Sequence, residues 1–221
     1  MQFELEKKVA FITGGGRGIG KAISLILAEQ GVNIALCGRT LSTLEETADE
    51  IKALGSEAWP IVADVSVFDN IKNFVSTAMK AAGRVDILVN NAVTSLQAPF
   101  EEQTDDHWRH HIDVKLMAYI RSAREVLPHM KEQRWGRIVN IGGMTARIAA
   151  PLRMTNGITN AGVSNFTKQF SDYAGKYNVT VNCVHPGPTA TERLRTGLER
   201  RAKDAGLELS DIEHQEIKSI P

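Results

Sequence analysis

The sequence contains little cysteine, no long apolar run and no excess of charge of either sign. Only two of the 221 residues are cysteine, which excludes a disulfide framework and predicts two buried free thiols, Cys37 and Cys183, in a reducing compartment. No apolar run is long enough to span a bilayer, and no charged-then-apolar leader begins the chain. Basic and acidic residues each number 26, so a general attraction to nucleic acids or membrane surfaces is not expected. Histidines, cysteines and carboxylates show no metal-ligand spacing. We therefore expect a soluble, cytoplasmic protein without a metal.

A glycine-rich turn is the most informative segment of the chain. Residues 13–20 read Thr-Gly-Gly-Gly-Arg-Gly-Ile-Gly, with an apolar run before them and helical spacing of apolar residues after them. In this strand–turn–helix context, glycines permit a tight turn, a close approach of backbone N–H groups to a pyrophosphate, and close packing of helix on strand. The helix N-terminus adds partial positive charge for the phosphates. The turn therefore predicts a dinucleotide site with contacts from Gly14, Gly16, Arg17, Ile19 and Gly20.

Strand-like and helical segments alternate along the rest of the chain. We predict strands at residues 8–13, 33–37, 58–63, 86–90, 137–141 and 179–184, and helices at residues 18–30, 41–54, 67–82, 104–131 and 154–176. Short apolar strands flanked by helices indicate a parallel sheet covered on both faces. The predicted fold is α/β, a Rossmann-type doubly wound parallel sheet in three α/β/α layers, forming a single domain over residues 1–221. Ligands of such sheets bind at the carboxyl ends of the strands.

The segment after the second predicted strand bears on the choice of cofactor. Where NAD-binding folds place a carboxylate for the ribose 2′-hydroxyl, this chain has a Gly-Arg-Thr sequence at residues 38–40. The guanidinium of Arg39 can hold a 2′-phosphate by charge-assisted hydrogen bonds, and Arg17 can assist from the glycine turn. The alternative is that both arginines are solvated surface residues. We favour NADP(H) over NAD(H), with Arg39 and Thr40 as cofactor-binding residues.

Further motifs make the sequence resemble the short-chain dehydrogenase/reductase family, and within it the β-ketoacyl-carrier-protein reductases. Besides the glycine turn, these motifs are Asp-Val at residues 64–65, Asn-Asn-Ala at 90–92, Arg-Ile-Val-Asn-Ile at 137–141 and Val-Thr-Val-Asn-Cys-Val-His-Pro-Gly at 179–187. The resemblance covers essentially the whole chain. It implies an adenine beside Asp64 and Val65, an adenosine ribose beside Asn91 and Ala92, and a nicotinamide beside Pro186, Gly187 and Thr191. It also implies a homodimer or homotetramer that packs through the two longest predicted helices.

The same resemblance defines four catalytic positions, and the family's side chain is missing from each. Lys115 stands at the asparagine position of the long fourth helix, and Gly143 stands at the serine position after the fifth strand. Thirteen residues further on, Asn156 replaces the tyrosine, and four residues later Asn160 replaces the lysine. No Tyr-x-x-x-Lys occurs anywhere in the chain. The tetrad is therefore degenerate, and we assign no residue a catalytic role.

These replacements remove the groups that would protonate a developing alkoxide. A tyrosine can supply the proton when a nearby ammonium lowers its pKa, and i,i+4 spacing puts both on one helix face. Amides can hydrogen-bond a carbonyl oxygen, but they cannot deliver a proton near neutral pH. Because general acid–base catalysis is typically worth about 10²–10⁴-fold, efficient reduction by the family mechanism is not expected.

Several other side chains are candidates for the missing proton or cation, each with a plainer alternative. Lys115 either projects toward the site as a displaced cation or acid, or reaches solvent or pairs with a carboxylate such as Asp113. His185 either donates a proton or packs in the turn after the sixth strand, and His110 and His111 are expected at the surface or an interface. Three threonines either hold a carbonyl oxygen or make local caps: Thr145, Thr155 and Thr159.

The end of the chain departs from the family pattern. Residues 189–221 are amphipathic and strongly basic at first, and they correspond to the family's flexible flap over the substrate, whereas the family's final helix and strand are absent.

Three hypotheses about function remain open. They are an oxidoreductase with a weakened mechanism on an unknown small-molecule carbonyl or alcohol, a catalytically silent nucleotide-binding or regulatory relative, and a non-redox lyase or isomerase.

Overall fold

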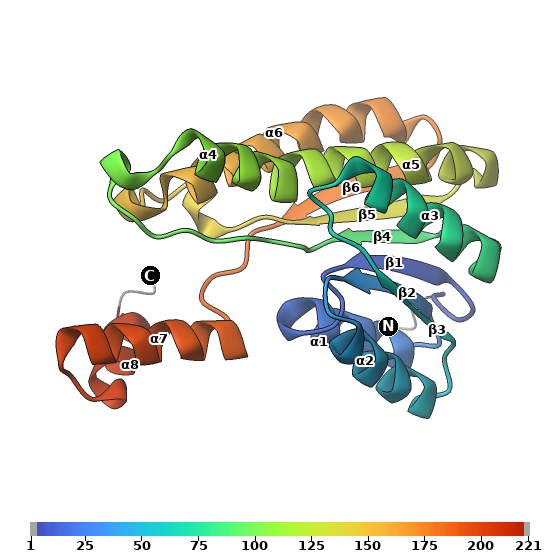
Figure 1. Ribbon diagram of the computed structural model, residues 1–221. Helices are drawn as coiled ribbons and strands as arrows, with labels where there is room; N and C mark the ends of the chain where they lie inside the picture. The colour runs from blue at the N-terminus through green and yellow to red at the C-terminus, as the bar shows by residue number, and fades with distance from the viewer. Residues whose placement is uncertain (1–3, 219–221) are drawn as a thin grey trace. The chain divides into compact units, whose positions relative to one another are not determined.

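A six-stranded parallel sheet forms the centre of the computed structural model, which describes residues 4–218 (Figure 1). Residues 1–3 and 219–221, at the two ends of the predicted domain and flap, lie outside the described residues. The strand order is β3-β2-β1-β4-β5-β6, and every neighbouring pair is parallel. The strands are β1 (Val9–Thr13), β2 (Asn33–Gly38), β3 (Ala58–Val62), β4 (Ile87–Asn90), β5 (Gly136–Ile141) and β6 (Val179–Val184). This arrangement confirms the predicted doubly wound Rossmann-type sheet.

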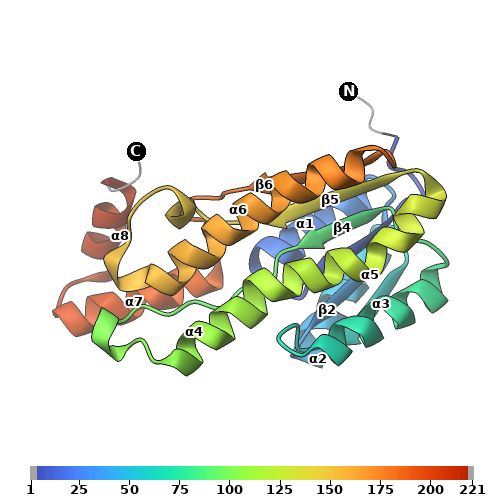
Figure 2. The same cartoon turned by 90° about the horizontal axis from the view of Figure 1, so that it is seen from above.

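Helices cover both faces of the sheet (Figure 2). On one face lie α1 (Gly18–Glu29) and α2 (Leu41–Ala53). On the other lie α3 (Phe68–Ala82), α4 (Asp105–His111), η2 (Ile112–Met117), α5 (Ala118–Gln133) and α6 (Met154–Gly175). Short 3-10 turns occur at η1 (Phe100–Glu102), η3 (Met144–Ala146) and η4 (Pro151–Arg153). The three predicted layers are therefore present.

Each central strand contributes alternate side chains to two separate cores. Phe11 of β1 belongs to the cluster under α3, α5 and α6, whereas its neighbour Ile12 belongs to the cluster under α1 and α2. All five residues of β1 are buried, because helices cover both faces of a sheet whose side chains alternate. That double burial is why the strand appears in the sequence as a continuous apolar run.

The long fourth helix contains a π-helical segment. The sequence predicts one helix over residues 104–131, and the structure has α4, η2 and α5 in succession from Asp105 to Gln133. The middle segment, η2, is a π-helix, a rare form that often occurs at functional positions. It carries Lys115, so the direction of this side chain differs from what regular helical periodicity predicts.

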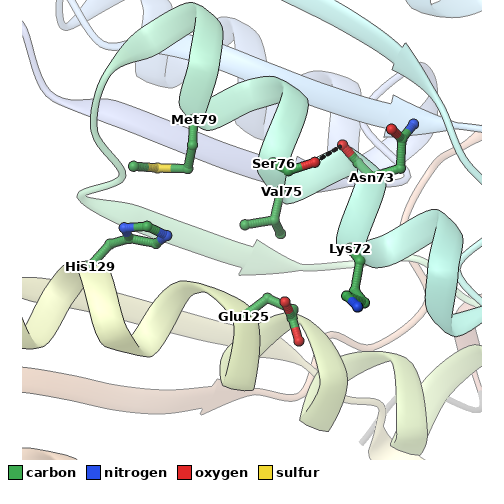
Figure 3. Close-up of a pocket in the computed structure, with 7 residues that line it drawn as sticks. All are labelled: Lys72, Asn73, Val75, Ser76, Met79, Glu125 and His129. Carbon is green, nitrogen blue, oxygen red and sulfur yellow. Dashed lines mark hydrogen bonds between the residues drawn. The ribbon is translucent and has the colours of Figure 1, made fainter.

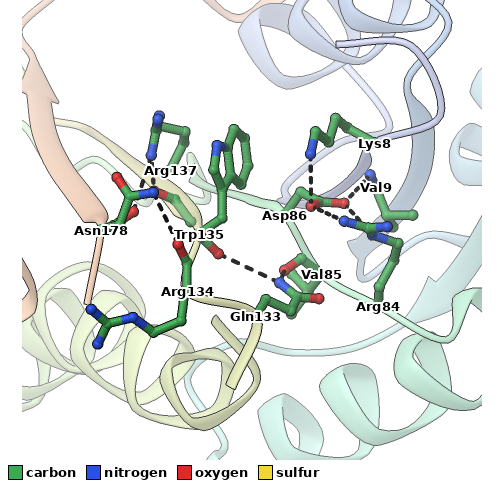
Figure 4. Close-up of polar contacts among 11 residues, drawn as sticks. Lys8, Val9, Arg84, Val85, Asp86, Gln133, Arg134, Trp135, Arg137 and Asn178 are labelled. Atoms are coloured by element: carbon green, nitrogen blue, oxygen red, sulfur yellow. Dashed lines mark hydrogen bonds and ion pairs between the residues drawn. The ribbon is translucent and has the colours of Figure 1, made fainter. Parts of the chain in front are cut away.

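A buried carboxylate ties together the amino-terminal ends of β1 and β4 (Figure 4). Asp86 Oδ2 accepts the backbone N–H of Val9 at 2.9 Å, and both its oxygens accept from the Arg84 guanidinium at 2.7 and 2.6 Å. Lys8 Nζ lies 3.6 Å from Asp86 Oδ1 and 4.3 Å from the centroid of a Trp135 ring. These contacts lie at the amino-terminal ends of the strands, opposite the carboxyl ends where a ligand is predicted, so we interpret them as structural.

The chain divides into two compact units, one ending at His185 and the other beginning at Pro186. The second unit contains α7 (Glu192–Ala205) and α8 (Leu209–Lys218). Its own small core consists of Leu198, Ala202 and Ile212. Within residues 4–218, no helix combines the length and the apolarity that crossing a membrane requires. A single domain with a flap over residues 189–221 stays a prediction.

Candidate functional site

The glycine turn joins the carboxyl end of β1 to the N-terminus of α1. Gly14 has a φ of +66°, a conformation that side chains disfavour. At Gly20, an added Cβ would collide with the backbone carbonyl of Gly14, so only glycine allows α1 to approach the turn this closely. A Cβ at Gly16 would lie 2.9 Å from Thr43 Oγ1 of α2. The packing of the turn therefore requires the glycines that the sequence analysis assigned to a dinucleotide site.

Asn91 braces this turn from the end of β4. Its Nδ2 donates to the backbone oxygens of Thr13 and Gly14, at 3.0 and 3.1 Å. In return, Thr13 Oγ1 accepts the backbone N–H groups of Asn91 and Ala92, at 3.0 and 3.1 Å. The predicted residues at the ends of β1 and β4 are thus joined in one network. This bracing was not predicted, because hydrogen bonds between distant segments leave no local signal.

Two exposed arginines lie near the glycine turn and the end of β2. Arg17 directly precedes α1, and Arg39 directly follows β2, with Thr40 as the N-cap of α2. Burial raises the pKa of Asp64, but hydrogen bonds from the Ser66 hydroxyl and backbone N–H, together with the positive charge of Arg39, leave it below its ordinary value. Asp64 is therefore ionised near Arg39 at neutral pH. Val65 beside it is buried.

Three of the four positions that the resemblance assigns to the tetrad lie together at the carboxyl end of β5: Lys115, Gly143 and Asn160. Lys115 is only 4% exposed, and its Nζ donates to the backbone oxygen of Gly142 at 3.1 Å. The alternative in which Lys115 reaches solvent is therefore wrong. A Cβ at Gly143 would lie 2.6 Å from Asn160 Nδ2, so Asn160 fills the space beside the vacated serine position. Asn156 stands one turn earlier on α6, as the spacing predicts.

His185 packs directly over the two glycines that follow β5. Its Nδ1 lies 3.0 Å from both the backbone N and the backbone O of Gly143, and its Nε2 lies 3.0 Å from Ser164 Oγ. A Cβ at Gly142 would collide with the imidazole ring. The interpretation that His185 packs in the turn after β6 is therefore confirmed. Ser164 was not predicted, because its contact with His185 joins residues far apart in the sequence.

Tyr119 lies beneath the same cluster and was also missed. Its hydroxyl donates to the backbone oxygen of Ile141 at 2.9 Å, and Lys115 Nζ lies 5.6 Å from its ring centroid. Burial raises the pKa of Tyr119 far above its ordinary value. A fully buried hydroxyl with an engaged proton and a raised pKa is a poor proton donor, so Tyr119 does not replace the family tyrosine.

The threonines near the vacated positions make local hydrogen bonds. Thr159 Oγ1 donates to the backbone oxygens of Thr155 and Asn156, at 2.9 and 3.2 Å. Thr145 Oγ1 accepts from Asn160 Nδ2 at 2.8 Å. Thr159 therefore bonds locally to the backbone of its own helix but does not cap it, and Thr145 holds the side chain of Asn160.

Two expectations about burial are wrong. His111, expected at the surface or an interface, is 3% exposed within this chain, and its Nδ1 lies 3.0 Å from the backbone oxygen of His107. Cys183, expected to be buried, is only partly so, and its Sγ lies 3.4 Å from His185 Nε2. Cys37 is buried as predicted, and burial raises the pKa of its thiol to about 12.

A hollow between α3 and α5 lies apart from these residues (Figure 3). It contains none of the predicted site residues, and its lining residues are Lys72, Asn73, Val75, Ser76, Met79, Glu125 and His129.

The predicted nicotinamide-binding residues Pro186, Gly187 and Thr191 belong to the second compact unit. There, Thr191 Oγ1 accepts the backbone N–H of Leu194 at 3.3 Å and caps α7.

The parallel sheet, its glycine turn and the motifs at the strand ends define a nucleotide-binding α/β protein. Residues 8–202 match the family described as short chain dehydrogenase, and the chain therefore belongs to this family of oxidoreductases. The NADPH-dependent reductase BacG of Bacillus subtilis is 31% identical over 219 residues, which are 98% of this chain and 85% of that protein. The 3-oxoacyl-acyl-carrier-protein reductase FabG of Staphylococcus epidermidis is 33% identical over 202 residues, 91% of this chain and 82% of that protein.

Solved structures agree with this membership. L-sorbose reductase from Gluconobacter frateurii, complexed with NADPH and L-sorbose, matches with a TM-score of 0.92 and 29% identity over 96% of this chain and 81% of that chain. An NAD+-bound xylitol dehydrogenase matches with a TM-score of 0.90 and 27% identity over 99% of this chain and 86% of that chain. Relatives with each cofactor are thus similar to this chain.

Proposed function

We propose that this cytoplasmic protein binds NADP(H) and is at most a slow oxidoreductase on a small carbonyl or alcohol. The observation that carries the proposal is Arg39, an exposed guanidinium directly after β2 where an NAD-binding fold places a carboxylate. Arg17 adds a second exposed cation at the glycine turn. The bound structures of relatives do not separate the two cofactors, so the proposal rests on these charges.

The described residues fit such a cofactor. The absence of a side chain at Gly20 lets α1 pack against the backbone of Gly14, and the turn places backbone N–H groups at the N-terminus of α1, where an anion is stabilised. Arg39 and Arg17 would hold the ribose 2′-phosphate. When bound, the nicotinamide supplies or accepts a hydride. Asn156 and Asn160 can orient a polar group of the substrate, but neither can transfer a proton.

A nucleotide titration of the purified protein tests the cofactor preference. Intrinsic fluorescence reports binding through Trp59, Trp108 and Trp135, and NADPH is compared with NADH. Because a hydrogen bond to a charged group is worth about 1.5–3 kcal/mol, we expect R39A to weaken NADPH binding by roughly tenfold or more. NADH binding should change little.

The control is R124A, which removes an exposed arginine from α5 and should leave both affinities unchanged. Equal binding of NADPH and NADH by the unsubstituted protein would contradict the cofactor preference. If neither nucleotide binds, the proposed function fails altogether.

A catalytically silent, regulatory relative is the second candidate. It is favoured by the packing of Asn160 against Gly143, because the side chain at one replaced position fills the space beside another. Saturating NADPH and a panel of ketones and aldehydes separate the candidates. Measurable NADPH oxidation supports the slow oxidoreductase, and binding without oxidation supports the silent relative. Product formation without a change in nicotinamide absorbance would support the remaining alternative, a lyase or isomerase.

We also propose that the protein is a homodimer or homotetramer that packs through α5 and α6. Aromatic side chains line α6, with the rings of Phe166 and Phe170 stacked at 5.2 Å and those of Phe170 and Tyr173 at 6.4 Å. Tyr173 is half exposed in the single chain, and aromatic side chains are enriched at interfaces. Light scattering after size-exclusion chromatography measures the mass, and a monomer would contradict this proposal.

A further inference from the structure

We propose that the amino-terminal edge of the sheet binds a chain of inorganic polyphosphate through a row of basic side chains, which we call the basic rim. Its members are Lys8, Arg84, Lys131, Arg134, Arg137 and Lys176. The basic rim lies at the ends of the strands opposite those where a nucleotide is predicted to bind. The proposal therefore goes beyond the proposed function and does not depend on it.

The basic rim gathers positive charge in a chain that has no net charge. Its members lie at the starts of four neighbouring strands, β1, β4, β5 and β6, or in the few residues that precede them. Only two carboxylates, Asp86 and Glu132, share these short segments, and Asp86 is fully buried beside Lys8 and Arg84. Because neighbouring strands lie about 4.8 Å apart, the four strand ends span about 14 Å. The positive charge is thus arranged as a short row.

Aromatic rings hold four of these cations in place. Lys8 Nζ and the guanidinium carbon of Arg137 each lie 4.3 Å from the centroid of a Trp135 ring, and Figure 4 shows Trp135 between the two side chains. The ammonium groups of Lys131 and Lys176 lie 4.4 and 5.2 Å from the ring centroid of Tyr177. A cation held over a ring is already ordered, so it loses less conformational entropy when it binds an anion.

Asn178 joins the two aromatic groups. Its backbone oxygen accepts from Arg137 at 3.2 Å, and its side-chain Nδ2 donates to the backbone oxygen of Arg134 at 2.9 Å. Tyr177 directly precedes it. Four members of the basic rim make no ion pair with a carboxylate in the described part of the chain: Lys131, Arg134, Arg137 and Lys176. These four cations are therefore available to an anionic ligand.

A chain made only of phosphate groups fits the basic rim better than a nucleic acid or an acidic peptide. Proteins that bind single-stranded nucleic acids stack the bases on aromatic faces, whereas the rings of Trp135 and Tyr177 already hold two cations each. Arginine matches phosphate through paired N–H donors, and lysine binds it as a point charge. Polyphosphate carries a negative charge on every unit, whereas a neutral backbone separates the carboxylates of a peptide.

Carboxylates mark the limits of the basic rim. Asp172 lies one helical turn before Lys176 on α6, and Glu57 directly precedes β3 at the far side of the sheet. Both residues are exposed. A polyanion that ran on beyond the basic rim would meet negative charge, so we expect only a short stretch of the polyphosphate chain to be bound.

Fluorescence anisotropy of labelled polyphosphate, measured on the unsubstituted protein, tests the proposal. Counterion release contributes about 0.7 per neutralised phosphate in single-stranded polyanions, so four contacts predict a slope of log affinity against log salt of about −3. Unlabelled polyphosphate should displace the label. Oligouridylate and polyglutamate should compete at least about tenfold less well. Saturating NADPH should not displace it, because the predicted nucleotide site lies at the other edge of the sheet.

Two double variants locate the binding site. R134Q/K176Q removes two of the available cations, and we expect it to weaken binding about tenfold or more and to reduce the slope to about −1.5. The matched control is R195Q/R200Q, which removes two exposed arginines from α7, where basic residues also cluster. It should leave the affinity and the slope unchanged. Circular dichroism confirms that each variant is folded.

Several outcomes would overturn the proposal. They are the absence of binding, binding that does not weaken with salt, and competition by oligouridylate or polyglutamate as strong as that by polyphosphate. Displacement by NADPH would place the chain in the cofactor site, and a loss confined to R195Q/R200Q would place it on α7; either result contradicts the basic rim. NADPH binding is measured separately by tryptophan fluorescence, so the proposed function can stand or fail on its own.

Discussion

Restoring the serine at Gly143 is expected to destabilise the protein unless Asn160 is removed as well. Gly143 has an extended backbone, with φ of −178° and ψ of 153°, so a serine meets no backbone strain there. The obstacle is the neighbouring side chain, because a Cβ at Gly143 would lie 2.6 Å from Asn160 Nδ2. The amide would have to move and give up its 2.8 Å hydrogen bond to Thr145.

The structure sets the size of this effect. Overpacking typically costs about 1–3 kcal/mol. Because Gly143 is only partly buried and the atom that must move ends a side chain, we expect G143S to lower the free energy of unfolding by an amount near the lower end of this range. N160A alone loses one hydrogen bond and should cost about 1 kcal/mol. In the double variant the clash no longer exists, so the combined loss should fall short of the sum of the single losses by about 1 kcal/mol or more.

Urea unfolding followed by tryptophan fluorescence measures all four proteins at one concentration. The control is G175S, in which the same change is made at the end of α6 where a Cβ has nothing within 4 Å; it should alter stability by no more than about 0.5 kcal/mol. If G143S is as stable as the unsubstituted protein, or if the losses of G143S and N160A simply add, then the two positions are not packed against each other and the reasoning fails.

Two further predictions concern buried charge. Burial lowers the pKa of His111 below its ordinary value of 6.5. As the pH falls, the unfolded chain therefore takes up a proton before the folded one does, and stability is lost below about pH 6.5. In urea unfolding, H111Q should lessen this loss, whereas H110Q, which changes an exposed neighbour, should not. D86A leaves the buried N–H of Val9 without its acceptor and should cost about 1–3 kcal/mol. D105A, which breaks an exposed ion pair, should cost less than about 1 kcal/mol; equal losses in D86A and D105A would contradict the structural role of Asp86.

Much of the fold was predictable because its signals are local. Buried strands of a parallel sheet appear as apolar runs and helices as periodic ones, so the predicted strands and helices match the observed ones to within a few residues. The glycine turn was predictable for the same reason, since Gly14 and Gly20 are required by a φ value and a backbone contact within one short segment. The four catalytic replacements were inferred from spacing alone and stay a prediction.

The sequence by itself therefore determined the class of fold and the position of the glycine turn. The dinucleotide contacts and the loss of the family's proton donors stay predictions. Only the tertiary structure decided what the replaced residues do. Lys115 lies in a π-helical segment and donates to Gly142, and His185, directly after β6, covers the glycines after β5. The amide of Asn156 in α6 is oriented by a distant partner, the backbone oxygen of Thr94. Each of these contacts joins segments far apart along the chain, and their geometry depends on how the sheet and helices pack. A local pattern cannot specify such contacts, because the same amide can be a donor or an acceptor depending on which atom its surroundings have already engaged.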